Sequence, residues 1–138
     1  MKEIPVIGKC YNHYNDGKIR PSRHSVVKII DVVPYSKVDK DLRDSIEREQ
    51  KSCDWLYAET TDVVVFAEVL TESDIDFKNQ FYIRDTKGGW FSIDHKNCFD
   101  SGRLDIDHTL TDSLKSDLYN GFYEYTPEQI EKFLERFV

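Results

Sequence analysis

Two runs of β-branched residues constrain the fold of this chain more than any other feature of its sequence. The first, HSVVKIIDVVPY (24–35), contains six Val or Ile residues, and the second, TTDVVVFAEVL (60–70), is a similar apolar run. β-Branched side chains favour extended backbone, so each run predicts a buried strand. In the first run the apolar residues fall on both faces, which predicts a central strand covered on both sides and ended by Pro34.

Three further strands are predicted from shorter patterns. Residues 4–14 mix apolar and aromatic side chains and precede Asp16-Gly17, a strong turn signal. Residues 80–93 predict a β-hairpin, because alternating apolar positions lie on both sides of a Lys-Gly-Gly turn at 87–89. Together with the two β-branched runs, these patterns predict about five strands.

The charged segment 36–56 predicts a helix that lies on the surface. Ser36 is a favourable N-cap residue, and Val38, Leu42 and Ile46 recur every four residues to form a narrow apolar stripe. Acid-then-base pairs four residues apart cover much of the remaining surface, which is typical of a face exposed to water.

Two more helices are predicted towards the C-terminus. Residues 109–121 predict a short helix with Thr111 as its cap. Residues 126–138 predict an amphipathic helix, because Thr126 suits its N-cap and a proline follows at the first helical position. The apolar stripe of this helix consists of Ile130, Phe133, Leu134, Phe137 and Val138.

The order of these elements predicts an α+β fold. Strands and helices do not alternate in a βαβ rhythm, so we expect a mainly antiparallel sheet. About five short, twisted strands favour either an open sheet or a partly open small barrel of the SH3 or OB type. The charged surface helix and the C-terminal amphipathic helix complete this architecture. No linker divides the chain, which predicts a single globular domain over residues 1–138.

The charge of the chain limits its partners. The net charge is −7, but the first 30 residues carry six basic and two acidic groups, whereas the remainder carries 13 basic and 24 acidic groups. An acidic body disfavours broad electrostatic adhesion to nucleic acid or to anionic membranes. It favours a basic partner.

Cysteine usage and the lack of long apolar runs predict a cytoplasmic protein. Cys10, Cys53 and Cys98 are odd in number and widely spaced, which does not suit a disulfide framework. No run approaches the roughly 20 apolar residues of a membrane-spanning helix, and the N-terminus lacks the apolar core of a signal peptide. We therefore expect no membrane association.

The stretch WFSIDHKNCFDSGRLDIDH (90–108) concentrates residue types that bind metals. It lacks the paired cysteines of a structural zinc site, and the glycine position of a calcium loop starting at Asp105 is occupied by leucine. A competing interpretation is that these aspartates cap turns by accepting hydrogen bonds from backbone N–H groups. A metal-dependent hydrolase is one alternative function, with a two-metal site built from Asp94, His95, Asp105, Asp107 and His108.

Nucleophilic catalysis has weaker support. Cys10 is the better candidate nucleophile, because Lys9 and His13 are close in sequence and would lower the pKa of a thiol. Cys98 stands among aspartates, which act in the opposite direction. No Gly-x-Ser-x-Gly motif is present, and an enzyme is not the favoured interpretation.

The N-terminal segment 9–24 interleaves basic and aromatic residues. Basic groups beside stackable rings are typical of single-stranded nucleic-acid binding, and small barrels often host this function. The acidic remainder of the chain opposes it. This second alternative would use Lys9, Tyr11, Tyr14, Lys18, Arg20 and Arg23.

The favoured interpretation is a non-catalytic, acidic binding protein of the inhibitor or immunity type, with a basic protein as its partner. An acidic surface would steer such a partner, and aromatic side chains would anchor it. The segment YNGFYEY (119–125) places four aromatic residues within seven positions. The sequence predicts neither a cofactor nor a particular oligomeric state. The candidate anchors are Trp90, Tyr119, Phe122, Tyr123 and Tyr125.

Overall fold

A computed structural model provides the fold. It describes residues 3–15, 25–52, 62–70, 79–85, 88–92 and 102–113, together with positions 126, 128, 131, 132 and 135. The turn predicted at Asp16-Gly17 and the apolar stripe of the predicted C-terminal helix lie outside these residues. No helix in the described part of the chain is long and apolar enough to cross a membrane.

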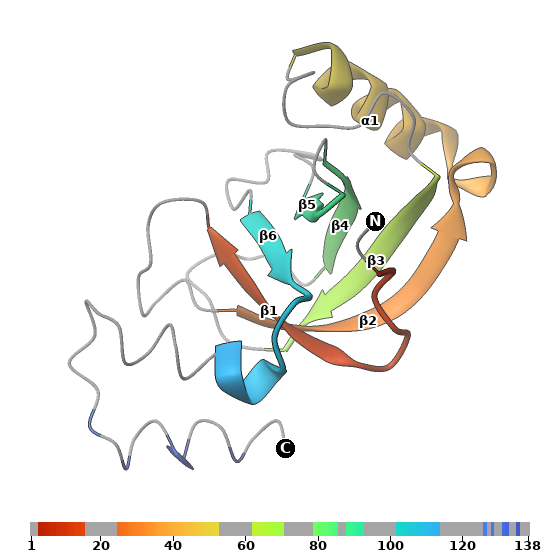
Figure 1. Cartoon of the computed structure of the whole chain (residues 1–138). Helices are drawn as coiled ribbons and strands as arrows, with labels where there is room; N and C mark the ends of the chain where they lie inside the picture. Colours follow the sequence, from red (N-terminus) through yellow and green to blue (C-terminus); the bar gives the residue numbers. More distant parts are fainter. Residues whose placement is uncertain are drawn as a thin grey trace.

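The described strands form a closed antiparallel barrel in which each strand pairs with its neighbours in sequence and the last pairs with the first (Figure 1). The prediction of a small, mainly antiparallel barrel is confirmed. The barrel has six strands rather than about five, and it is closed rather than partly open. The strands are β1 (Cys10–Asn15), β2 (Ser25–Pro34), β3 (Val63–Val69), β4 (Asn79–Arg84), β5 (Trp90–Ser92) and β6 (Gly102–Asp105).

The shortest strands close the barrel. β6 pairs with β1 through Asn12 opposite Asp105, and with β5 through Phe91 opposite Arg103. It has only four residues, which is too short for a clear alternating pattern in the sequence. Its partner β1 is remote in the chain, so the sequence did not indicate that this segment closes a barrel.

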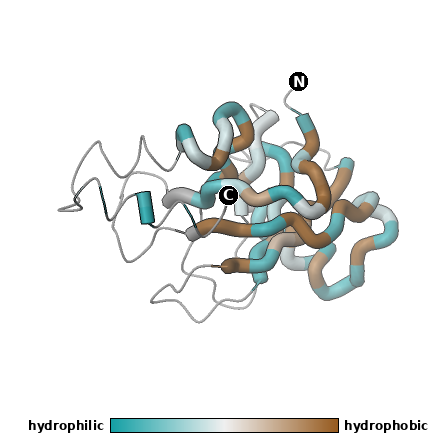
Figure 2. The backbone as a smooth tube through the Cα atoms, turned by 90° about the horizontal axis from the view of Figure 1, so that it is seen from below, coloured by the Kyte–Doolittle hydropathy of each residue, from teal (hydrophilic) through white to brown (hydrophobic). Residues whose placement is uncertain are grey.

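One face of each strand lines a hydrophobic interior. Successive side chains of a strand point to opposite faces, so alternate residues are buried together. Figure 2 shows hydrophobic stretches, in brown, interspersed with hydrophilic stretches, in teal, along the chain. The interior cluster consists of Tyr11, Val27, Ile29, Val65, Ala67, Tyr82, Trp90 and Leu104.

The predicted surface helix is observed as α1 (Lys40–Ser52), which lies outside the barrel (Figure 1). Val38, Leu42 and Ile46 form a second core with residues from the outer faces of β3, β4 and β5. The predicted start at Ser36 is wrong. Residues Tyr35–Lys37 form a separate 3₁₀ turn, η2, closed by the Val38 N–H and the Tyr35 carbonyl.

The strand predicted at 24–35 is confirmed as β2, but it is not covered evenly on both sides. Its inner face lines the barrel, whereas Lys28 and Ile30 on its outer part are exposed. The register with β3 shifts between Ile29 and Asp31, so Ile30 has no partner position on the neighbouring strand. Such a bulge accommodates the strong twist of a small barrel.

The N-terminal segment departs from the predicted strand at 4–14. β1 begins only at Cys10. Residues 3–9 precede it outside any strand, with a turn at Ile7 and Gly8 closed by the Lys9 N–H and the Val6 carbonyl at 3.1 Å, and Glu3 contacts Trp90. We call residues 3–9 the N-terminal strap. Gly8 has a φ of 88°, a backbone conformation that favours glycine, and its N–H donates to the Ile29 carbonyl at 2.8 Å.

Candidate functional site

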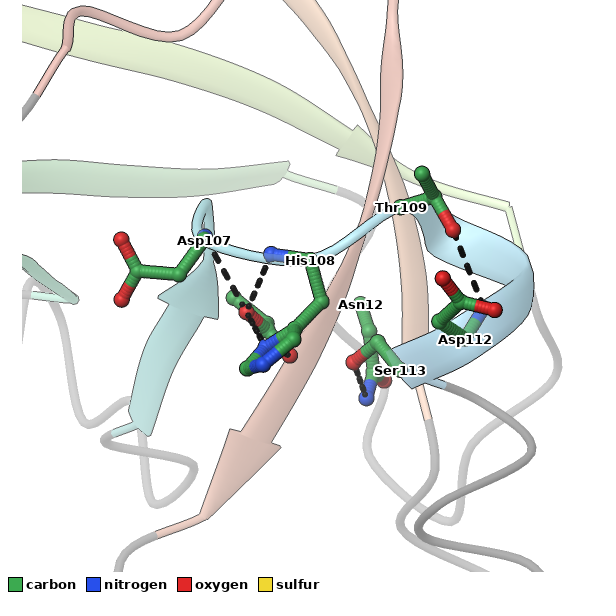
Figure 3. Close-up of polar contacts among 7 residues, drawn as sticks. Asn12, Asp107, His108, Thr109, Asp112 and Ser113 are labelled. Atoms are coloured by element: carbon green, nitrogen blue, oxygen red, sulfur yellow. Dashed lines mark hydrogen bonds and ion pairs between the residues drawn. The ribbon is translucent and has the colours of Figure 1, made fainter.

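The first predicted site lies directly after β6, where Asp105 organises a turn. Its Oδ1 accepts hydrogen bonds from the backbone N–H groups of Asp107 at 3.2 Å and His108 at 3.3 Å. The same oxygen lies 3.0 Å from Nδ1 of His108. Figure 3 shows this turn beside the short helical segment that follows it.

Asp105 also determines the electrostatics of the turn. Its hydrogen bond to His108, followed by its charge, raises the pKa of the exposed imidazole above the ordinary value of 6.5. The charges of Asp107 and Asp112 act in the same direction. The turn therefore favours a protonated histidine within an acidic surface.

The predicted metal site is only partly within the described residues. Asp94 and His95 lie outside them, whereas Asp105, Asp107 and His108 share one turn. Among the described residues, no group of three or more His, Cys, Asp or Glu side chains is arranged to hold a metal ion. The contacts of Asp105 with backbone N–H groups are those of a turn-capping aspartate. The two-metal site stays a prediction.

The helical segment after this turn is capped by Thr109 rather than by the predicted Thr111. Thr109 Oγ1 accepts the Asp112 N–H at 3.2 Å, and the Thr109 carbonyl accepts the Ser113 N–H at 2.9 Å. The segment is fastened to the barrel, because Ser113 Oγ accepts a hydrogen bond from Asn12 Nδ2 at 2.9 Å (Figure 3).

Trp90 is buried at the end of the barrel that the N-terminal strap covers. Its side chain has an exposed fraction of 0%, and its Nε1–H donates to the Glu3 carbonyl at 2.9 Å. The guanidinium of Arg84 lies 4.6 Å from the ring centroid, and its Nε is 3.0 Å from Asp62 Oδ1. The indole is therefore enclosed by the strap, a cation and the core.

The burial of Trp90 corrects its predicted role as an exposed anchor. Strand alternation turns Trp90 inward and Phe91 outward, and both are buried on opposite sides of the barrel wall. The remaining predicted anchors lie outside the described residues: Tyr119, Phe122, Tyr123 and Tyr125.

The predicted nucleic-acid surface loses one of its aromatic residues. Tyr11 is only 3% exposed and belongs to the interior cluster, so its ring is not available for stacking on a base. Lys9 is exposed, with its Nζ 5.3 Å from the centroid of that ring. The structure does not describe the remaining residues of this surface, which are the side chain of Tyr14 and residues Lys18, Arg20 and Arg23.

Cys10 and His13 are close in sequence, but their side chains do not lie together. Residues three apart on a strand point to opposite faces, and His13 points inward. Its Nδ1 lies 2.7 Å from the Tyr82 hydroxyl, whereas Cys10 is half-buried. A histidine on the opposite face of the barrel wall cannot accept the proton of this thiol.

A buried ionic contact that the sequence did not indicate fastens the β4–β5 hairpin. Asp85 accepts hydrogen bonds from the Gly89 N–H at 2.8 Å and from Arg103 of β6. A Cβ atom at Gly89 would lie 3.0 Å from Asp85 Oδ2, so a larger residue here would press against the Asp85 carboxylate. Arg103 also stacks on Phe91 at 5.0 Å. The contact joins the β4–β5 hairpin to β6 and gives the buried Asp85 carboxylate a cationic partner.

Comparison with known proteins adds no functional information. The chain matches no protein-family model, and no curated protein or solved structure is significantly similar to it. Function is therefore inferred from the residues of the chain itself. Two described features expose charged or apolar side chains to solvent: the acidic residues after β6 and the strap over Trp90.

Proposed function

We propose that this protein is a non-catalytic binding protein whose partner is a basic protein, in the manner of an inhibitor or immunity protein. The observation that carries the proposal is the acidic surface formed after β6. It contains Asp105, Asp107 and Asp112, and residues 104–114 include no Lys or Arg. Asp107 and Asp112 are exposed. We call residues 105–112 the acidic turn.

Exposed apolar side chains lie at the same end of the barrel. β6 runs antiparallel to β1, so residues 106–109 continue towards the end where β1 begins and the strap precedes it. Ile4, Val6 and Ile7 of the strap are exposed large apolar side chains. Protein interfaces commonly combine such apolar contacts with a charged rim.

Electrostatic steering gives the acidic turn its function in this proposal. The chain carries a net charge of −7, and complementary charge increases the rate at which a basic partner forms a correctly oriented complex. The effect falls as salt screens the charges. Binding to a basic protein should therefore weaken with increasing ionic strength.

The experiment compares two double variants of the full-length chain. Asp107→Asn with Asp112→Asn removes two charges from the acidic turn, and Asp41→Asn with Asp44→Asn removes two exposed charges from α1. The tagged native chain captures its partner from source cells, and the purified pair is measured by calorimetry and stopped-flow. We expect the first variant to lower the association rate about three- to tenfold and the second to change it little.

Three outcomes would contradict the proposal. The captured species could be a nucleic acid that is released by nuclease, which favours the single-stranded nucleic-acid alternative. An equal decrease in the association rate for both double variants would show that only the net charge of the chain affects binding. Stoichiometric zinc or manganese that is lost in Asp105→Ala with Asp107→Ala would favour the metal-dependent hydrolase.

A further inference from the structure

The N-terminal strap has an unusual distribution of burial. Glu3, Ile4, Val6 and Ile7 are exposed, whereas Pro5 between them is buried. An apolar segment held by its side chains would bury its larger residues rather than its proline. The strap is therefore held by its backbone and by Pro5.

Two hydrogen bonds from barrel side chains flank this proline. The Trp90 Nε1–H donates to the Glu3 carbonyl at 2.9 Å, and the Tyr11 hydroxyl accepts the Val6 N–H at 3.0 Å. Both aromatic residues belong to the interior cluster. Two aromatic side chains thus bind the polar backbone on each side of Pro5.

This arrangement has the chemistry of proline-peptide recognition. Extended proline-containing segments lose little conformational entropy on binding, and aromatic-lined grooves recognise them. The indole N–H of tryptophan supplies a hydrogen bond to a carbonyl that the peptide cannot satisfy internally. The side chains of Ile4 and Val6 point to solvent and contribute little to such recognition.

We propose that Trp90 and Tyr11 form a binding site for an extended, proline-containing peptide, and that residues Glu3–Val6 occupy this site in cis. A partner that presents such a peptide displaces the strap and takes over its two hydrogen bonds. The strap then acts as an autoinhibitory ligand. This site uses Trp90 and Tyr11 rather than the acidic turn, and it goes beyond the proposed function by assigning a peptide ligand to the barrel under the strap.

The strap has an advantage over any peptide in trans. Val6 is four residues from the start of β1, so the tether keeps the segment at a high effective concentration near its site. The apparent affinity for a second peptide is reduced by the fraction of molecules in which the strap is open. Weakening the strap should therefore increase the affinity for an external peptide.

The test uses the full-length chain and a synthetic peptide with the sequence of residues 2–9, KEIPVIGK, blocked at both ends. Binding is measured by fluorescence anisotropy to the native protein and to Pro5→Ala. We expect Pro5→Ala to bind the peptide at least about tenfold more tightly than the native chain does. The matched control is Ile7→Ala, which alters an exposed strap residue and should leave the peptide affinity at the native value.

A second variant and a second peptide keep the test independent of one substitution. Val6→Pro removes the N–H that donates to Tyr11, and it should increase peptide affinity in the same direction as Pro5→Ala. The peptide KEIAVIGK, with alanine in place of proline, should bind at least about tenfold more weakly than KEIPVIGK. Nuclear magnetic resonance of each variant reports whether the barrel is folded.

The indole signal of Trp90 locates the bound peptide. The chain has two tryptophans, and Trp90→Phe identifies which indole N–H resonance belongs to Trp90. We expect this resonance to shift in Pro5→Ala and to return towards its native position when the peptide is added.

Equal peptide affinity in native and folded strap variants would overturn the proposal, as would equal binding of the proline and alanine peptides. Asp107→Asn with Asp112→Asn should leave peptide affinity unchanged, so failure of this inference is distinguishable from failure of the proposed function.

Discussion

The Tyr82 hydroxyl lies 2.7 Å from Nδ1 of His13, and both side chains are buried inside the barrel. Their rings meet edge to face at 62°, with centroids 5.7 Å apart. The two residues belong to β1 and β4, which are not neighbours in the barrel. This contact therefore crosses the interior and depends on closure of the barrel.

Removing the Tyr82 hydroxyl should destabilise the protein. Tyr82→Phe leaves His13 without this partner in a buried setting, and we expect a loss of about 1–3 kcal/mol in the free energy of unfolding. Urea denaturation monitored by circular dichroism measures it. The matched control is Tyr35→Phe, whose hydroxyl donates to Glu47 at 3.0 Å near the surface and should contribute less. Equal losses in the two variants would contradict the prediction.

Packing of α1 on the barrel should depend on Ile46. Its side chain is 0% exposed, and truncation leaves a cavity in the second core, so Ile46→Ala should cost about 2–5 kcal/mol. Ile30→Ala makes the same change at a side chain that is 48% exposed, and it should cost within about 1 kcal/mol. Thermal denaturation compares the two variants. A smaller loss for Ile46→Ala than for Ile30→Ala would show that α1 does not pack as described.

Stability should depend more on Asp85, whose carboxylate is buried beside Arg103, than on Asp62, whose carboxylate is exposed beside Arg84. The Asp85 side chain is 3% exposed, so Asp85→Ala removes a buried acceptor from both the Gly89 N–H and Arg103 and should cost about 1–3 kcal/mol. Asp62 is 53% exposed, and Asp62→Ala should cost within about 1 kcal/mol. Chemical denaturation of both variants tests this order, and the reverse order would refute it.

The pKa of His108 should depend on Asp105. Because the native pKa is raised above 6.5, the contribution of this pair to stability is fully present below pH 6.5 and is lost as pH rises through the native pKa. We expect Asp105→Asn to lower the pKa of His108 in a nuclear magnetic resonance titration. Asp107→Asn, which removes only a weaker charge effect, is the control and should lower the pKa less. A larger effect of Asp107→Asn would count against this assignment.

Local sequence patterns were sufficient where one element could be recognised by itself. The β-branched run at 24–35 predicted β2, and the spacing of Val38, Leu42 and Ile46 predicted the face that α1 buries. Helix and strand periodicity depend on neighbouring residues, so they are visible in a single sequence. The helix start was misplaced because Ser36 and Asp39 both suit the position before a helix, and the chain forms a 3₁₀ turn first.

The candidate sites were less predictable, because a residue's chemistry depends on which face of the barrel it occupies. Trp90 and Tyr11 are residue types that often bind partners, but strand alternation turns their rings into the core, so that only their polar atoms reach the strap. The sequence does not indicate the contact between Asp85 and Arg103, because the two residues are 18 positions apart and no local pattern connects them.

The sequence by itself determined the strand-forming runs, the apolar stripe of α1, the acidic balance and the small antiparallel architecture. Only the tertiary structure decided that the barrel closes through a four-residue strand, that His13 meets Tyr82 across its interior, and that Trp90 and Tyr11 hydrogen-bond the backbone on either side of Pro5. The physical reason is that local periodicity is set by backbone geometry, whereas these contacts join residues that are brought together only when all six strands pair.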